Sequence, residues 1–128
     1  MIFINFTNHA SVNWPQKQMD AALQHIGGHP NARIIDLPFP AVPPQATEAE
    51  VMHIAKSVAD DILVQEPAAV LCQGEFTLAF AIAGLLKRHG IPVLAACSER
   101  NVQEHIVQGT AEKVVKFHFV QFRKYLQF

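Results

Sequence analysis

The stretch Val70-Leu71-Cys72-Gln73-Gly74-Glu75-Phe76-Thr77 decides the fold class, because an apolar strand runs into a glycine turn and then directly into an apolar helix. In α/β proteins, this kind of junction is where ligands usually bind. The first N–H groups of a helix are unpaired and carry partial positive charge, so a phosphate or carboxylate binds there with little help from side chains. The loop at residues 73–77 therefore predicts an anion or ligand site.

Short apolar runs alternate with amphipathic stretches on both sides of this loop, as is typical of β-α-β units. The final apolar run changes phase near Phe119, which predicts a bulge or bend in its strand. We expect five strands, at residues 2–7, 33–37, 68–72, 92–97 and 115–123.

Three helices are expected between these strands. The first begins near Asn13, has Pro15 in its first turn and ends at Gly27-Gly28. The second follows the capping-box spacing that starts at Thr47 and extends to about residue 63. The third covers residues 76–88 and has almost no polar face, which predicts a buried helix. The proline-rich stretch 38–44 lacks too many N–H donors for a helix or central strand, so we expect a surface loop.

Length and composition set limits on the protein class. The 128 residues predict a single domain over 1–128 with its own core. A net charge of −1 argues against a surface that coats long DNA or RNA. No run of residues is long enough to span a bilayer and no signal-peptide pattern is present, so we expect no membrane association and a cytoplasmic location. Cys72 and Cys97 lack CxxC spacing, which favours reduced thiols over a disulfide or zinc site.

Three polar segments follow strands of the expected sheet: residues 7–11, 73–77 and 98–100. The carboxyl ends of parallel strands share one edge, where ligands bind at the point of strand-order reversal. These segments offer amides, hydroxyls, one imidazole, two carboxylates and one guanidinium, which suit an uncharged or anionic polar ligand. There is no GxGxxG or Walker A sequence and no metal-ligand spacing, so we expect no nucleotide cofactor and no metal.

Four segments in register resemble a known family. They are Asn8-His9, the run 70–76, Ser98-Glu99-Arg100, and the closing run 119–125. Together they are similar to the small CRISPR-associated proteins with a CARF-like (CRISPR-associated Rossmann fold) domain, of the ring nuclease group of type III immunity. The resemblance covers nearly the whole chain. It implies a Rossmann-like three-layer sandwich, with a mainly parallel five-stranded sheet and helices on both faces.

The resemblance also implies a function. Family members bind a cyclic oligoadenylate, here expected to be cyclic tetra-adenylate, in a pocket on the two-fold axis of a homodimer. Cleavage of the ring ends the antiviral signal. A 2′-hydroxyl attacks the neighbouring phosphate without any metal, so the protein has only to hold in-line geometry, neutralise charge and move protons. We expect the dimer to form through the third helix and the C-terminal strand.

Site roles follow from the resemblance. The amides of residues 74–77 and the Arg100 guanidinium are expected to contact phosphate, while His9 or Glu75 assists the 2′-hydroxyl or the leaving oxygen. Each role has a structural alternative: Glu75 caps its helix, His9 bonds across its own loop, Gln73 satisfies neighbouring backbone, and Arg100 is a solvated charge. The expected catalytic residues are His9, Glu75 and Arg100, and the expected ligand-binding residues are Asn8, Ser11, Gln73, Gly74, Phe76, Thr77, Ser98 and Glu99.

Two other functions remain open. The same pocket can sense or sequester the cyclic ligand without cutting it, because errors of about an ångström in positioning decide the rate. An unrelated flavodoxin-like hydrolase or transferase, acting as a monomer on a nucleoside or sugar phosphate, has the same pattern of strands and loops. The aromatic side chains Phe117, Phe119 and Phe122 are expected in the core or a subunit interface, with adenine stacking as the alternative.

Overall fold

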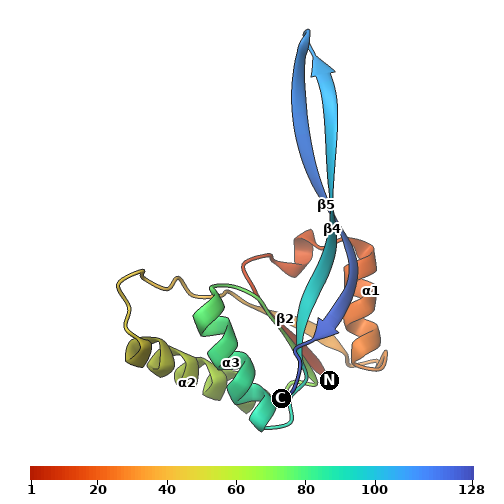
Figure 1. The fold of residues 1–128 in the computed structure, drawn as a ribbon. Coiled ribbons are helices and arrows are strands. Elements are labelled where there is room, and N and C mark those ends of the chain that lie inside the picture. Colours follow the sequence, from red (N-terminus) through yellow and green to blue (C-terminus); the bar gives the residue numbers. More distant parts are fainter.

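A computed structural model describes all of residues 1–128. The five expected strands and three expected helices are all present, with one additional short 3-10 helix. None of the helices has both the length and the apolar character needed to cross a membrane. The elements are, in chain order, β1 (Ile2–Phe6), η1 (Ser11–Asn13), α1 (Gln16–His25), β2 (Arg33–Leu37), α2 (Glu48–Val64), β3 (Ala69–Cys72), α3 (Phe76–Arg88), β4 (Val93–Val107) and β5 (Thr110–Lys124) (Figure 1).

The strands form one strongly curled sheet in the order β2-β1-β3-β4-β5 (Figure 1). The pairs β1–β2, β1–β3 and β3–β4 are parallel, and β5 is antiparallel to β4. The prediction of a mainly parallel α/β sheet, Rossmann-like in kind, is therefore confirmed. Strand order reverses between β1 and β3, since β2 lies on one side of β1 and β3 on the other. In open sheets of this kind the ligand crevice lies at that switch point.

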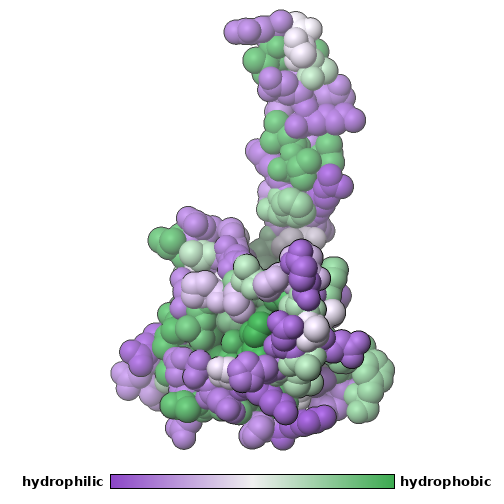
Figure 2. Space-filling model, turned by 90° about the vertical axis from the view of Figure 1, so that its left-hand side faces the viewer, coloured by the Kyte–Doolittle hydropathy of each residue, from purple (hydrophilic) through white to green (hydrophobic).

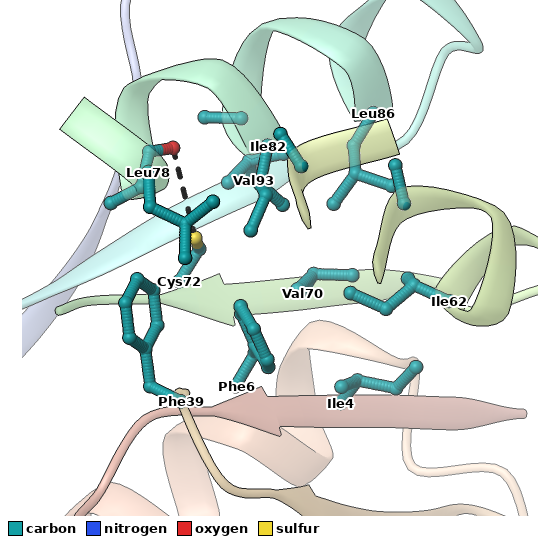
Figure 3. Packing of buried hydrophobic residues seen from close by; sticks show 14 residues of the cluster. Ile4, Phe6, Phe39, Ile62, Val70, Cys72, Leu78, Ile82, Leu86 and Val93 are labelled. Atoms are coloured by element: carbon teal, nitrogen blue, oxygen red, sulfur yellow. Dashed lines mark hydrogen bonds between the residues drawn. The ribbon is translucent and has the colours of Figure 1, made fainter. Parts of the chain in front are cut away.

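Two hydrophobic clusters lie on opposite faces of the sheet, because successive side chains of a strand point to opposite faces. One cluster packs β1, β3 and β4 against α2 and α3 (Figure 3). The other packs the alternate side chains of the same strands, together with Trp14, Ala22 and Ile26, against the α1 side. Each fully buried Ile, Leu or Phe contributes about 1.5–3 kcal/mol, so these clusters supply most of the stability of the fold.

Local signals fix the ends of the helices. At the start of α2, the Thr47 hydroxyl accepts from the Glu50 N–H at 3.1 Å and the Glu50 carboxylate accepts from the Thr47 N–H at 3.4 Å, which confirms the capping box. Pro15 is the N-cap of α1, and Gly27 beyond its end has a φ of 74° that favours glycine. The expected boundaries are therefore correct to within a few residues.

The proline-rich stretch after β2 is irregular, as expected, but it is anchored in the core. Phe39 is 5% exposed and its ring packs against that of Phe6, with ring centroids 4.9 Å apart (Figure 3). Gly74, the first turn residue after β3, lies directly against the Phe39 ring. A Cβ atom on Gly74 would overlap this ring. The turn that opens α3 therefore requires glycine for space, since its φ is not in the left-handed region.

The two cysteines are free, as expected, and their environments differ. Cys72 is buried under α3, where its thiol donates to the Ala79 carbonyl at 3.9 Å (Figure 3). Burial raises the pKa of Cys72 to about 12. The Tyr125 hydroxyl donates to the Cys72 carbonyl at 2.7 Å, and burial raises the pKa of Tyr125 as well. Cys97 is half-buried.

The expected end of the fourth strand at Cys97 is wrong. Strand β4 continues to Val107 and pairs with β5 along its whole length, so that residues 98–119 form a two-stranded hairpin that projects from the body (Figure 1). We call this segment the arm. Its turn, Gln108-Gly109, has positive φ at both residues (52° and 78°), as a two-residue type I′ hairpin requires. The arm reads as a loop in sequence because it has no core beneath it to require buried apolar side chains.

The predicted bulge is present at the base of the arm. Cys97 pairs with Gln121 whereas Ser98 pairs with Phe119, so Val120 has no opposite residue. This extra residue accounts for the phase change in the sequence. Because of it, Phe119 and Phe122 lie on the same side of the sheet, with ring centroids 4.9 Å apart.

The contact between Gly74 and Phe39 predicts a matched pair of effects. Gly74→Ala should destabilise the protein by about 1–3 kcal/mol, because the buried Phe39 ring must shift. Gly84→Ala, on the exposed side of α3 with nothing within 4 Å of its added methyl group, should stabilise it by about 0.5–1 kcal/mol. Urea unfolding of both variants measures this. Equal effects at the two positions would contradict the close packing of Gly74.

Candidate functional site

A cleft of about 790 Å³ opens at the carboxyl edge of the sheet, at the switch point between β1 and β3. Its walls come from the loop after β1, from η1 and the start of α1, from the end of β3, and from the base of the arm. The residues that line it are Thr7, Asn8, His9, Asn13, Trp14, Pro15, Gln18, Leu71, Gln73, Gly74, Ala96, Ser98, Phe117 and Phe119.

The loop after β1 is held by a buried carboxamide. Asn5 has no exposed surface, and its Nδ2 donates to the His9 carbonyl and to Asp36 Oδ1, both at 2.9 Å. Its Oδ1 accepts from the Thr7 hydroxyl at 2.8 Å, and that hydroxyl accepts from the His9 N–H at 3.1 Å. The buried Trp14 Nε1 donates to the same His9 carbonyl at 3.1 Å. The backbone of His9 is therefore fixed while its imidazole remains free to face a ligand.

Asp36, at the end of β2, ties the next residues of this loop to the sheet. Its carboxylate accepts from the Ser11 hydroxyl at 3.0 Å and from the Ser11 N–H at 3.2 Å. Ser11 does not line the cleft. Its side chain therefore serves to position the loop, although we expected it to contact the ligand.

Gln73 satisfies a neighbouring backbone group and also lines the cleft. Its Oε1 accepts from the Ala96 N–H at 3.0 Å, which extends the β3–β4 pairing by one residue beyond the strand. This bond fixes the orientation of the carboxamide, because the oxygen is the atom that faces the N–H. The Nε2 group, with two donors, is left for a ligand in the cleft.

The cleft brings together five of the expected site residues. Asn8 and His9 come from the loop after β1, Gln73 and Gly74 from the end of β3, and Ser98 from β4. The side chains of Asn8 and His9 are exposed at this edge. Three segments that are distant in sequence thus contribute to one cleft, as the expected topology requires.

The start of α3 is not part of the cleft. Glu75 is its N-cap: the carboxylate accepts from the Thr77 hydroxyl at 2.7 Å, from the Thr77 N–H at 3.0 Å and from the Leu78 N–H at 2.9 Å. These hydrogen bonds, that of the Thr77 hydroxyl first, lower the pKa of Glu75 below its ordinary value. Phe76 is 90% exposed. The helix terminus that we expected to bind phosphate is thus occupied by the protein's own carboxylate.

Glu99 and Arg100 lie on the arm, in a strand and not in the expected loop. They pair with His118 and Phe117 across the hairpin. Neither lines the cleft. Arg100 is on the same face of the arm as Ser98 and directly opposite Phe117, both of which line the cleft, so Arg100 lies beside the cleft wall at its outer end.

Sequence reasoning assigned no role in the site to Trp14 or Gln18. Trp14 precedes α1 and Gln18 lies in its first turn, whereas Phe117 and Phe119 come from the arm. Gln18 is 7% exposed, which is unusual for a polar residue on an amphipathic helix, and no sequence signal marks it. The aromatic pair was seen in the sequence, with adenine stacking as its alternative reading.

The chemical character of the cleft is neutral and aromatic. His9 is the one ionisable side chain among the lining residues, and the remaining polar groups are carboxamides and hydroxyls. Rings of Trp14, Phe117 and Phe119 form the apolar part. Carboxamides and aromatic rings at this density suit the edges and faces of a nucleobase or a similar planar polar group. No group of three or more metal-ligating side chains gathers in the structure.

Comparison with known protein families matches residues 1–123 to the family described as Uncharacterized protein MJ1673 family. The chain belongs to the MJ1673 family. The matched residues include every element that lines the cleft. No curated protein matches this MJ1673-family chain.

A comparison with solved structures finds similarity to a UDP-N-acetylglucosamine 2-epimerase. The identity is 17% and the TM-score is 0.45, with 73% of the MJ1673-family chain and 32% of the epimerase chain covered. The chain thus spans about a third of the length of that epimerase.

The buried carboxamide of Asn5 predicts a coupled loss of stability and order. Asn5→Ala should cost about 1–3 kcal/mol, because it leaves buried partners without a hydrogen bond. Backbone amides of residues 7–11 should exchange faster with deuterium as the loop loosens. Thr47→Ala removes a distant helix cap and should cost about 1 kcal/mol. In Thr47→Ala, deuterium exchange at residues 7–11 should match that of the wild type. If Asn5→Ala and Thr47→Ala exchange these amides at the same rate, the positioning role of Asn5 is contradicted.

The lowered pKa of Glu75 predicts a pH-dependent helix cap. A depressed pKa in the folded state means that the cap stabilises above the ordinary glutamate pKa, and that this contribution is lost as pH falls through the folded value. Glu75→Gln should therefore be less stable than wild type at neutral pH, and the difference should shrink in acid. Urea unfolding of both proteins from pH 7 down to pH 3 measures it. A difference that is constant with pH would contradict the assignment.

Proposed function

We propose that this chain is a ring nuclease of type III CRISPR immunity, which binds a cyclic oligoadenylate in the cleft and opens the ring. Cyclic tetra-adenylate is the proposed ligand, and a cytoplasmic homodimer the proposed form. The proposal includes the CARF-like, three-layer classification of the fold. It rests on the resemblance of four segments in register, each of which contributes at least one residue to the same cleft.

The contents of the cleft are the observation that supports this proposal best. Adenine has flat faces that stack on aromatic rings and an edge that forms hydrogen bonds with carboxamides, and the cleft contains both kinds of side chain. Phe117, which is 67% exposed, provides an open ring, and the largely buried Trp14 and Phe119 lie behind it, while Asn8 and the Gln73 amide nitrogen provide polar groups.

His9 is the proposed proton-transfer group. In metal-independent cleavage the 2′-hydroxyl loses its proton as it attacks phosphorus, the bond to the 5′-oxygen breaks, and that oxygen gains a proton. The products are a 2′,3′-cyclic phosphate and a 5′-hydroxyl end. The His9 carbonyl accepts from both Asn5 and Trp14, which fixes the backbone from which the imidazole reaches these oxygens. Arg100, the one arginine of the arm, lies on its cleft side and is proposed to neutralise phosphate charge.

Glu75 is not retained in the proposed mechanism. Its carboxylate is engaged by the hydroxyl and N–H groups of its own helix, and it lies outside the cleft. The phosphates are therefore proposed to be bound from the α1 side and the arm, and not at the start of α3.

One observation favours a second candidate, a sensor that binds the ring without cutting it. His9 is the one ionisable side chain that lines the cleft, whereas proton transfer to and from two oxygens usually employs two groups. The cleft of a single chain therefore contains no second side chain for the other proton transfer. Cleavage of the ring requires the Arg100 guanidinium, or a side chain from a second copy of the chain, as that second group.

Incubation with cyclic tri-, tetra- and hexa-adenylate in a chelator, followed by chromatography, tests the proposal. We expect cyclic tetra-adenylate to be converted to linear products that end in a 2′,3′-cyclic phosphate. His9→Ala should slow this by about 10²–10⁴-fold while it retains ligand binding. His53→Ala, an exposed imidazole on α2, is the matched control and should behave as wild type.

Two results decide between the candidates. If the ring is bound but stays intact over hours at excess protein, the nuclease is ruled out and the sensor is supported. If no cyclic oligoadenylate is bound by the purified chain, both candidates fail.

A further inference from the structure

The two faces of the arm differ in character. Directly opposite residues of an antiparallel pair share a face, so the β4–β5 register assigns each pair to one side. One face continues from the α1 side of the sheet and contains the pairs Ser98/Phe119, Arg100/Phe117, Val102/Val115, Glu104/Lys113 and Ile106/Ala111. We call it the apolar arm face. The opposite face contains Glu99/His118, Asn101/Lys116, Gln103/Val114 and His105/Glu112.

The apolar arm face is uncovered in the single chain beyond Phe119, which is itself buried at the base of the arm. Ile106 is 80% exposed, Phe117 67% and Val102 53%. Figure 2 shows the arm standing clear of the body, with hydrophobic side chains on its surface between hydrophilic ones. An isolated two-stranded hairpin is only marginally stable in water, and a contiguous apolar patch usually marks an interface. The arm therefore requires a partner to cover this face.

We propose that the partner is a second copy of this chain, whose apolar arm face packs antiparallel against the first across a two-fold axis at the Val102/Val115 pair. Such an interface is self-complementary, since the same patch serves both copies. At about 3.4 Å per residue, the part of β4 from Ser98 to Val107 spans about 30 Å, long enough for each tip to reach the base of the other arm.

Charge complementarity selects this register. With the axis at Val102, Arg100 faces the partner's Glu104, and the same contact is repeated on the other side of the axis. Arg100 and Glu104 of one chain are about 14 Å apart along the strand and cannot pair with each other. Moving the axis by one pair toward the base places Arg100 against the partner's Arg100, and moving it toward the tip places Glu104 against the partner's Glu104. Both shifts oppose like charges.

The rest of the apolar arm face also matches in this register. Val102 and Val115 meet their own copies, and Phe117 lies over the aliphatic part of the partner's Lys113. A parallel arrangement, with both bodies at the same end, is disfavoured by α1. This helix, about 10 Å across, stands out from the same face next to the arm, so two copies of it would hold the arms apart.

The docked arm also completes the cleft. Ser98, Phe117 and Phe119 belong both to the apolar arm face and to the cleft lining. The partner's Ile106 lies opposite the Ser98/Phe119 pair, at the rim of the cleft, so each copy contributes to the site of the other. This docking does not depend on which ligand the cleft binds, and its test uses no ligand.

A charge-swap series measured by sedimentation tests the proposal at micromolar to submillimolar concentrations. Wild type should dimerise, and Arg100→Glu and Glu104→Arg should each weaken the dimer by about tenfold or more, because like charges then meet at both symmetry-related contacts. The double swap R100E/E104R should restore dimerisation. Glu112→Arg, the same kind of change on the opposite face of the arm, is the control and should leave it unchanged. A monomeric wild type, or a double swap that fails to restore the dimer, would overturn the proposal.

Disulfide trapping fixes the register independently. In a Cys97→Ser background, Val102→Cys lies on the proposed axis and should form a covalent dimer on mild oxidation, whereas Gln103→Cys on the opposite face should not. Phe80→Glu, on the exposed side of α3, addresses the interface expected there from sequence and should leave the dimer intact. Dissociation by Phe80→Glu with no effect of Arg100→Glu would assign the interface to α3 and reject the arm. Circular dichroism of each variant confirms that the body stays folded.

Discussion

The hydrogen bonds of the Asn5 carboxamide are the constraint on which the site depends. A buried polar group is costly unless its donors and acceptors are satisfied, and Asn5 has no exposed surface. Its partners are Asp36 at the end of β2, the His9 carbonyl and the Thr7 hydroxyl. The apolar clusters on both faces would tolerate many arrangements of the loop after β1. This network selects one, and it is the one that directs Asn8 and His9 into the cleft.

The body of the fold was predictable from sequence because burial imposes a period on the chain. Strand β2 and helix α3 were predicted at their observed bounds, and the capping box placed the start of α2. The arm was not predictable by the same reasoning. Apolar periodicity reports on packing against a core, and the part of β4 after Cys97 has none. The phase change near Phe119 was nevertheless correctly read as a bulge, since it occurs where β5 still packs against the body.

The site was predictable only in part, for a related reason. Residues that directly follow β1 and β3 must reach the carboxyl edge of a parallel sheet, so Asn8, His9, Gln73 and Gly74 were found from topology alone. Trp14, Gln18 and Phe117 come to the same cleft through tertiary packing of α1 and of the arm, which no local pattern encodes. For Glu75, its position in the sequence at the start of α3 allowed both a helix cap and a ligand contact. The distances to Thr77 and Leu78 assign the cap.

The two thiols give this chain an uneven sensitivity to oxidants. Sulfenic acid formation and alkylation proceed through the thiolate, which a pKa of about 12 all but removes from Cys72 at neutral pH. Reaction at Cys72 thus requires α3 to lift away from the sheet. Half-buried Cys97, at the base of the arm, is partly accessible without any such opening and is modified first. The rate of thiol labelling at Cys72 therefore measures how often the core opens, while the rate at Cys97 reports on the accessibility of the strand that joins the body to the arm.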